Sequence, residues 1–399
     1  MPALSRRLDR VGVAATVAMT IKARALRAEG HRVIQLTIGE PDFASPPHAI
    51  EAAHQAALSG DTKYPPQDGQ PALKQAIQRK FRRDQGLDYA LDEIMVANGG
   101  KQAIFDAMLA TLDEGDEVLI PAPYWAAYKL MAQTLGAIPV TITCPQNNGF
   151  KLRPEDLDAA ITPRTKWLIL NNPCNPTGAA YTKDELIALS HVLESRNHVW
   201  LMSDDMYEHL TYGVPHVTMA ALVPALRERI LTISGVSKTY AMTGWRIGFA
   251  AGPKGLIRAM VNMQGQVSAG VSTIGQAAAV AALDGPQEQV AEQCAAYRRR
   301  RDMVVEMLNR APGMACHWPE GAFYVYPSVA GCLGKTSAGG ARIETDEDFA
   351  LALLAEQHVA VVQGAAFGMS PYVRISYATD DASLQEAMER IQAFCAGLR

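Results

Sequence analysis

The sequence has few cysteines and none of the spacings that mark disulfide-rich or metal-binding proteins. Its 399 residues include six cysteines, with no Cys-x-x-Cys pair and no Cys/His metal-ligand spacing. Scattered cysteines in apolar surroundings are typical of reduced thiols inside the cell. The sequence therefore predicts a cytoplasmic protein without a structural metal.

The sequence also lacks a long apolar run and an excess of positive charge. The N-terminal apolar patch at 11–19 is too short to span a bilayer, so no membrane association is expected. The formal net charge is -4, and the one basic run, at 298–301, lies in a helical pattern where a solvated face explains it. We therefore expect no nucleic-acid partner.

The length exceeds what one hydrophobic core usually supports, so two domains are expected. Short β-type runs alternate with amphipathic helical runs, which predicts an α/β protein with a mainly parallel sheet. Candidate strands lie at 117–122, 139–144, 166–170, 198–203, 230–234 and 247–251, and candidate helices at 101–112 and 183–194. Thr182 and Glu185 form a predicted capping box for the second helix.

The pattern changes after about residue 285. A long helix is predicted at 287–310, a Gly-rich strand at 321–326 and a loop at 331–341. We expect an N-terminal arm and small-domain segment at 1–44, a large domain at 45–285 and a smaller α/β domain at 286–399.

Polar residues follow several predicted strands, and ligands of open parallel sheets bind beyond the carboxyl ends of strands. Gly99, Gly100 and Lys101 begin a predicted helix and could bind a phosphate. The alternative is an ordinary Gly-Gly turn between a strand and a helix, with no ligand. Two acids, Asp204 and Asp205, end another strand, and alternation directs at most one of them into a given pocket. Helix capping is the alternative role for either acid.

Lys238 follows the predicted strand at 230–234. A lysine amine becomes a nucleophile when burial or a neighbouring cation lowers its pKa, and Arg246 could be that cation or could hold a phosphate. A surface lysine in a Gly/Ser turn is the alternative. Together, the strand ends offer a phosphate cradle, an acid and a reactive lysine, the groups that pyridoxal phosphate requires.

Ten separated runs carry a family resemblance, and they follow the family's order over nearly the whole chain. They are residues 36–43, 62–64, 99–102, 123–125, 171–178, 203–207, 237–238, 242–248, 321–324 and 373–376. The chain resembles the class I aminotransferases of fold type I, and is similar to bacterial aspartate aminotransferases. The resemblance implies a seven-stranded type of sheet between helices, pyridoxal 5'-phosphate as cofactor and a homodimer with shared active sites.

The resemblance also implies catalytic roles. Lys238 is expected to hold the cofactor as an aldimine and to move the α-proton, and Asp204 to pair with the pyridine nitrogen. Tyr207 and Asn175 are expected to bind the phenolic oxygen, and Trp125 to stack on the ring.

The phosphate is expected to bind to a further set of residues. These are Gly99, Gly100, Lys101, Ser237 and Arg246, with Tyr64 from a second subunit. Gly235 departs from the serine that many relatives have three residues before the catalytic lysine, and Ser237 is expected to compensate.

For the substrate, the resemblance implies that Arg374 binds the α-carboxylate with Gly39, Asn175 and Trp125 beside it. Lys101 and Thr16 occupy the positions whose side chains bind the distal carboxylate in the aspartate subgroup. This favours aspartate or glutamate as donor and 2-oxoglutarate or oxaloacetate as acceptor.

Two alternatives stay open. The apolar segment at 266–276 fits an aromatic or apolar side-chain pocket, with Phe367 as a wall. A pyridoxal-phosphate-dependent β-lyase could use the same lysine, because the site decides which bond breaks.

Overall fold

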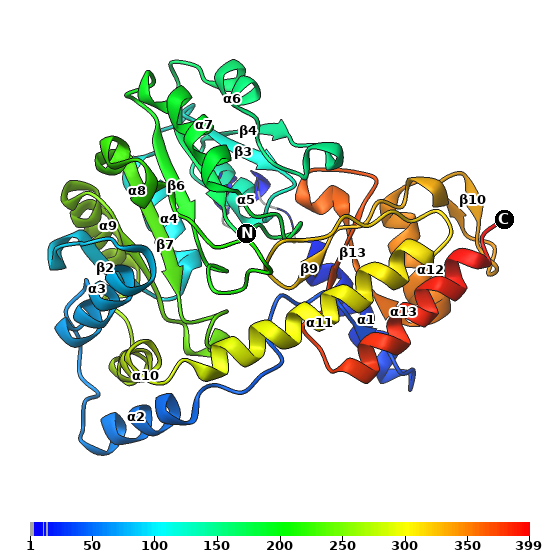
Figure 1. Cartoon of the computed structure of the whole chain (residues 1–399), viewed down its shortest axis with the longest axis horizontal. Coiled ribbons are helices and arrows are strands. Elements are labelled where there is room, and N and C mark those ends of the chain that lie inside the picture. Colours follow the sequence, from blue (N-terminus) through cyan, green and yellow to red (C-terminus); the bar gives the residue numbers. More distant parts are fainter. Residues whose placement is uncertain (1–3, 11, 13–14) are drawn as a thin grey trace.

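The computed structural model describes residues 4–10, 12 and 15–399, and its largest element is a seven-stranded sheet (Figure 1). The strand order is β2-β8-β7-β6-β5-β3-β4. All neighbouring strands pair in parallel except β8, which is antiparallel to both β2 and β7. The strands are β2 (Ile94–Ala97), β3 (Glu117–Ala122), β4 (Ile138–Thr143), β5 (Thr165–Asn171), β6 (Trp200–Asp204), β7 (Ile230–Gly235) and β8 (Gly248–Ala251). The predicted mainly parallel α/β sheet is confirmed.

Helices cover both faces of this sheet, because successive strand residues point to opposite sides. In β2, for example, Ile94 and Val96 belong to one apolar core, and Met95 and Ala97 belong to the other. One core is shared with α4 (Gly100–Thr111), α5 (Ala127–Thr134) and α9 (Lys254–Val267). The other is shared with α3 (Pro71–Gln85), α6 (Pro154–Ala160), α7 (Lys183–Glu194), α8 (Met219–Leu222) and α10 (Thr273–Asp284).

Helix α7 begins and ends where the sequence predicted. The hydroxyl of Thr182 accepts a hydrogen bond from the Glu185 backbone at 3.3 Å, and the Glu185 carboxylate accepts one from the Thr182 backbone at 2.7 Å. This reciprocal pair satisfies two backbone donors that a helix start leaves without partners. The predicted capping box is confirmed.

A second group of elements lies beyond the large sheet and has its own apolar core. Helix α11 (Glu288–Arg310) runs from beside α10 to α12 (Asp346–Gln357) and α13 (Asp381–Ala396), as Figure 1 shows. Helix α1 (Ala15–Ala28) contributes Met19 and Ala23 to the same core. Helix α2 (Pro47–Leu58) packs instead against α10.

The strands of this second group are short. Strand β1 (Ile34–Gln35) pairs in parallel with β12 (Val359–Ala360), and β14 (Val373–Ser376) lies between β13 (Val362–Gln363) and β9 (Tyr324–Val325). The strand predicted at 321–326 is therefore too long, because Ala322 has a φ of 57° and cannot continue an extended strand. The loop predicted at 331–341 contains β10 (Lys335–Thr336), which pairs with β11 (Arg342–Ile343).

The division into segments 1–44, 45–285 and 286–399 stays a prediction. Among the described residues, none of the helices has the length and apolar character needed to cross a bilayer.

Candidate active site

A cavity of about 540 Å³ lies where the carboxyl ends of the central strands face the second group of elements. Asn171 ends β5, Asp204 ends β6, and Lys238 follows β7, so the parallel sheet brings three distant segments to one edge. Most residues predicted for the site line this cavity: Gly39, Gly100, Lys101, Trp125, Asn175, Asp204, Tyr207, Ser237, Lys238, Arg246 and Arg374.

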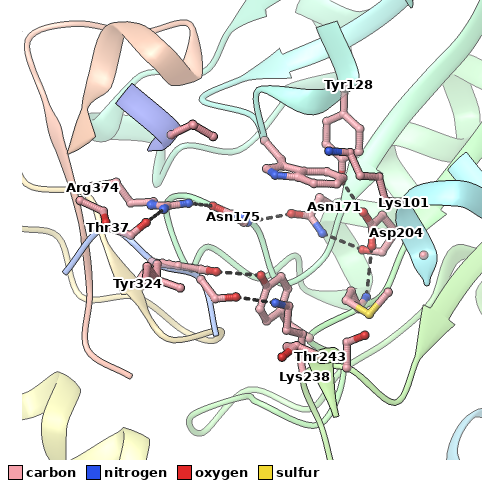
Figure 2. Close-up of a pocket in the computed structure, with 18 of the residues that line it drawn as sticks. Thr37, Lys101, Tyr128, Asn171, Asn175, Asp204, Lys238, Thr243, Tyr324 and Arg374 are labelled. Atoms are coloured by element: carbon pink, nitrogen blue, oxygen red, sulfur yellow. Dashed lines mark hydrogen bonds between the residues drawn. The ribbon is translucent and has the colours of Figure 1, made fainter. Parts of the chain in front are cut away.

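Lys238 lies between the two ends of the cavity (Figure 2). Its ammonium donates a hydrogen bond to the carbonyl oxygen of Gly39 and lies 5.9 Å from the centre of the Phe323 ring. Burial lowers the pKa of Lys238 to about 8; the charge of Glu40 opposes this shift, while those of Arg374 and Arg246 reinforce it. A substantial fraction of the amine is therefore neutral near physiological pH.

Asp204 is buried at the opposite end of the cavity from Arg374, as Figure 2 shows. One carboxylate oxygen accepts a hydrogen bond from the Tyr128 hydroxyl, and the other accepts one from the Met206 backbone at 3.3 Å. Burial raises the pKa of Asp204 to about 6, although the Tyr128 hydrogen bond lowers it. Asp205 accepts a hydrogen bond from Ser203 instead and lies outside the cavity lining, as strand alternation predicted.

Arg374 is a buried guanidinium that meets an amide, a carbonyl and two aromatic faces. Its Nη1 donates to Asn175 Oδ1 at 3.1 Å, and its Nη2 donates to the carbonyl oxygen of Thr37. The centres of the Tyr324 and Phe367 rings each lie 4.8 Å from its Cζ atom. Its Nε has no hydrogen-bond partner, and no carboxylate among the described residues pairs with it. The guanidinium is thus buried with a donor left over for an anion.

The start of α4 approaches Arg246 very closely. Gly99 has a φ of 83°, and a Cβ atom added there would lie 2.3 Å from Arg246 Nη2, so only glycine fits. Arg246 donates to the carbonyl oxygens of Thr243 at 2.9 Å and Asn98 at 3.2 Å. With the backbone of Gly100 and the hydroxyl of Ser237, this end of the cavity presents donors to an anion.

Gly235, which departs from the family pattern, packs against strand β8. A Cβ atom added there would lie 3.0 Å from both the Gly248 Cα and the Ile247 carbonyl oxygen. A serine side chain would press against this backbone, so close strand packing explains the glycine.

Several predicted residues lie outside this chain's cavity lining. Gly99 contacts Arg246 but does not line the cavity, Tyr64 is 92% exposed, and Phe367 is buried against Arg374 and is not a pocket wall. No residue of 266–276 lines the cavity either. The side chain of Thr16 lies outside the described residues.

Other cavity residues were missed from the sequence. Tyr324 has its hydroxyl 3.0 Å from that of Tyr207, and Asn171 accepts a hydrogen bond from the Asn175 backbone at 2.7 Å. Both belong to runs that carry the family resemblance. Tyr128 lies in the first turn of α5, three residues after Trp125, and belongs to none of these runs.

The family model for aminotransferase class I and II matches residues 31–391. The chain belongs to this family. The aminotransferase is 56% identical to the aspartate/prephenate aminotransferase of Cereibacter sphaeroides, over all of both chains. It is 52% identical to the aspartate aminotransferase of Rhizobium meliloti, with 98% of this chain and 95% of the relative covered.

Solved structures agree with this assignment. The aspartate aminotransferase from Rhizobium meliloti superposes with a TM-score of 0.98, at 51% identity and full coverage of both chains. The Thermus thermophilus aspartate aminotransferase, solved with maleate, has a TM-score of 0.92 at 40% identity, covering 99% of this chain and 100% of that one. The predicted fold type and the predicted aminotransferase activity are confirmed.

The depressed pKa of Lys238 leads to a prediction for the cofactor-free protein. Labelling of Lys238 by an amine-reactive reagent, followed by mass spectrometry, should reach half its maximal rate near pH 8, because the neutral amine predominates above that pH. Surface lysines titrate at about 10.4. Arg246→Gln should move the midpoint upward by removing a charge that disfavours protonation, whereas Arg258→Gln, outside the cavity, should not. A midpoint equal to that of surface lysines contradicts the assignment.

Proposed function

We propose that this aminotransferase uses pyridoxal 5'-phosphate to move an amino group between an acidic L-amino acid and a 2-oxo acid. The observation that carries the proposal is the buried Arg374 guanidinium, whose Nε faces no partner among the described residues. A cation desolvated in this way needs an anionic ligand, and a substrate α-carboxylate accepts two parallel hydrogen bonds from a guanidinium.

The residues at the other end of the cavity fit the cofactor. Gly100, Ser237 and Arg246 would hold its phosphate, and Trp125 would cover its ring. Asp204 would face the ring nitrogen, since a positive partner favours the ionised carboxylate that burial disfavours. When bound, the cofactor supplies an electron sink for the bond that breaks at the substrate Cα.

The chain's own groups then have separate tasks. Arg374 and Asn175 orient the α-carboxylate, which sets the position of the substrate Cα. Lys238 Nζ, neutral in part because of its lowered pKa, takes the proton from Cα as a general base. Tyr207 and Asn175 would donate hydrogen bonds to the phenolic oxygen of the cofactor.

The charge of the cavity supports a dicarboxylic substrate. Among the described residues, the lining holds five cationic residues and one acid, Asp204; the cations are Arg24, Lys101, Lys238, Arg246 and Arg374. After the roles above are assigned, Lys101 and Arg24 are left without an ion pair among the described residues. Lys101 lies 5.5 Å over the Trp125 ring and can reach a distal carboxylate. Aspartate and glutamate are therefore the proposed donors.

One observation favours a second substrate class. Val17 and Ile21 on α1 line the cavity and are 48% and 58% exposed, and Ile38 beside them is 45% exposed. This apolar wall would suit a larger or ring-bearing side chain, and one relative is named an aspartate/prephenate aminotransferase. We keep a ring-bearing acid as the second candidate.

We further propose a homodimer in which Tyr64 completes the partner's phosphate site. Tyr64 is exposed and outside its own cavity, and the neighbouring Pro65 packs near Gly270 of the apolar segment 266–276. The segment around Tyr64 and the segment 266–276 would thus reach the same active site of the partner subunit. Sedimentation analysis should give twice the chain mass, and Tyr64→Phe should weaken cofactor affinity; a monomer with full affinity contradicts the proposal.

The function is tested by a single-turnover half-reaction. Mixing the cofactor-loaded protein with L-aspartate should convert the visible absorbance of the cofactor and release oxaloacetate, because only transamination retains the amino group on the protein. Lys238→Ala should lower the conversion rate by at least about 100-fold through loss of the base. Pyruvate and ammonia released without an oxo-acid acceptor would point to a β-lyase instead.

Substrate choice is tested by Lys101→Ala. Loss of this cation should lower kcat/KM for aspartate by about ten- to 100-fold and leave that for phenylalanine within about twofold, since one charge-assisted hydrogen bond contributes about 1.5–3 kcal/mol. Lys129→Ala, on the neighbouring helix α5 and outside the cavity, is the control. An equal decrease in kcat/KM for aspartate and phenylalanine would refute the role of Lys101 in binding the distal carboxylate.

A further inference from the structure

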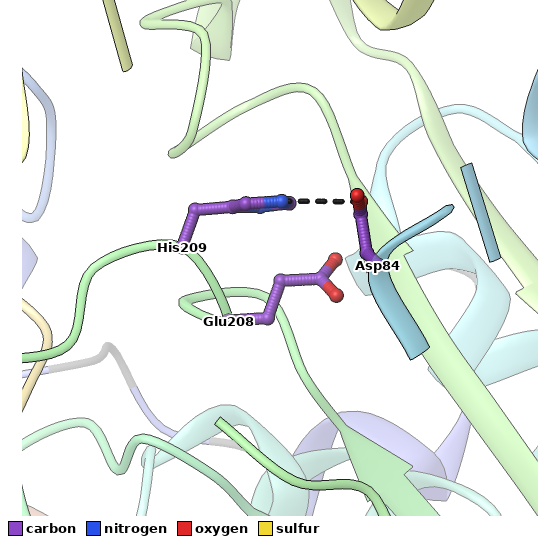
Figure 3. A group of neighbouring side chains, drawn as sticks. All are labelled: Asp84, Glu208 and His209. Carbon is purple, nitrogen blue, oxygen red and sulfur yellow. Dashed lines mark hydrogen bonds and ion pairs between the residues drawn. The ribbon is translucent and has the colours of Figure 1, made fainter. Parts of the chain in front are cut away.

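A cluster of charged side chains lies outside the cavity lining, between α3 and the segments that carry Tyr207 and Lys238. It comprises Lys80, Asp84, Glu208 and His209, and is called the Lys80 cluster below. Figure 3 shows His209 directed at Asp84, with the Glu208 carboxylate beside them. Lys80 and Glu208 are 1% and 5% exposed, so this ion pair is removed from solvent.

The cluster has the ligand types of a metal site but is already neutralised. Ligand atoms of Asp84, Glu208 and His209 lie within 4.8 Å of one another. The Lys80 ammonium, however, bonds to Glu208 and lies 3.7 Å from Asp84, and Arg83 also pairs with Asp84 at 2.6 Å. The carboxylates of Glu208 and Asp84 are thus already paired with cations, and the cluster needs another explanation.

The first connection of the cluster runs through Glu208. Its carboxylate accepts hydrogen bonds from Ser234 Oγ at 2.6 Å, from Gln85 Nε2 at 2.6 Å and from Lys80. Burial raises the pKa of Glu208, but the charges of Lys80, His209 and His216 outweigh burial and hold it at about 2. An ionised Glu208 therefore connects α3 to Ser234, near the end of strand β7. Glu208 also directly follows Tyr207 in the chain.

The second connection runs through His209. Its Nε2 lies 3.1 Å from Asp84 Oδ2, and its Nδ1 lies 3.3 Å from the hydroxyl of Thr239. Thr239 is 2% exposed and adjoins Lys238. Helix α3 is thus bonded to Glu208 and His209, the two residues after Tyr207, and through them to Ser234 and Thr239 on either side of Lys238.

We infer, on the basis of the proposed function, that the Lys80 cluster is a positioning device that fixes the Lys238 amine relative to Tyr207. Its members do not line the cavity and act through Ser234 and Thr239. A general base must keep its nitrogen within hydrogen-bond reach of the proton that it takes. A misplacement of about 1 Å can lower a rate about 100-fold, so fixing both backbone segments to one helix has a direct catalytic consequence.

The test uses small substitutions in the holoenzyme. Thr239→Val and Ser234→Ala each remove one hydroxyl while keeping the side-chain volume nearly constant. Each should lower kcat with aspartate by about ten- to 100-fold with KM within about twofold. Thr239→Ser, which restores the hydroxyl, should recover most of the lost kcat.

A second readout does not depend on turnover. The pH midpoint of the visible absorbance of the bound cofactor reports the surroundings of Lys238, and it should shift measurably in Thr239→Val and return in Thr239→Ser. In the cofactor-free protein, the pH midpoint of Lys238 labelling should likewise shift in Thr239→Val and return in Thr239→Ser.

Matched controls separate positioning from general stability. Ser190→Ala removes another buried hydroxyl, which bonds to the Ile187 carbonyl within α7, and Arg79→Met breaks the α3 surface pair with Asp284. Both controls should keep the wild-type kcat and midpoint. Wild-type kcat and midpoints in Thr239→Val and Ser234→Ala, with changes in melting temperature only, would overturn the inference. Absence of any half-reaction in the wild type would instead refute the proposed function.

Discussion

Burial of the Arg374 guanidinium without a carboxylate partner is the interaction on which the rest of the site depends. Desolvating a cation is costly unless other groups replace water. Here Thr37 supplies a carbonyl, Asn175 supplies an amide oxygen, and Tyr324 and Phe367 supply aromatic faces. These groups come from the N-terminal segment, the large sheet and the second group of elements. The arginine is therefore held only when all three segments are in place.

The same constraint links charge at the two ends of the cavity. Arg374 and Arg246 disfavour the protonated form of Lys238, and burial disfavours the ionised form of Asp204. Because burial raises the pKa of Asp204 from 3.8 to about 6, ionising this carboxyl lowers the stability of the fold progressively as the pH rises from about 4 to about 6, and fully above that. An anion beside Arg374 and a cation beside Asp204 would relieve these costs, so ligand binding and stability are expected to be coupled.

Local patterns in the sequence were enough to predict the elements and the groups at the strand ends. The capping box of α7 and the strand at 117–122 depend on neighbours in the chain, and both occur with the predicted bounds. Asp204 and Lys238 follow buried strands, so the parallel sheet alone brings them to one edge. The family resemblance then added Arg374, which lies on a different sheet.

Contacts between distant segments could not be predicted in this way. Arg374 and Thr37 are separated by most of the chain, and the hydrogen bond from Tyr128 to Asp204 joins a helix to a strand end. The Lys80 cluster gave no local signal, because Lys80 reads as an ordinary solvated position of an amphipathic helix. Its burial depends on how α3 packs against the segment that follows Tyr207.

We propose that Lys238, the cavity lysine whose pKa is lowered, is the lysine that binds the cofactor covalently. This proposal is tested most directly by treating the cofactor-loaded protein with borohydride and locating the modified lysine by peptide mass spectrometry. The structure predicts a single modified peptide, the one that contains Lys238. Modification of another cavity lysine, Lys101, or of no lysine at all, would contradict it.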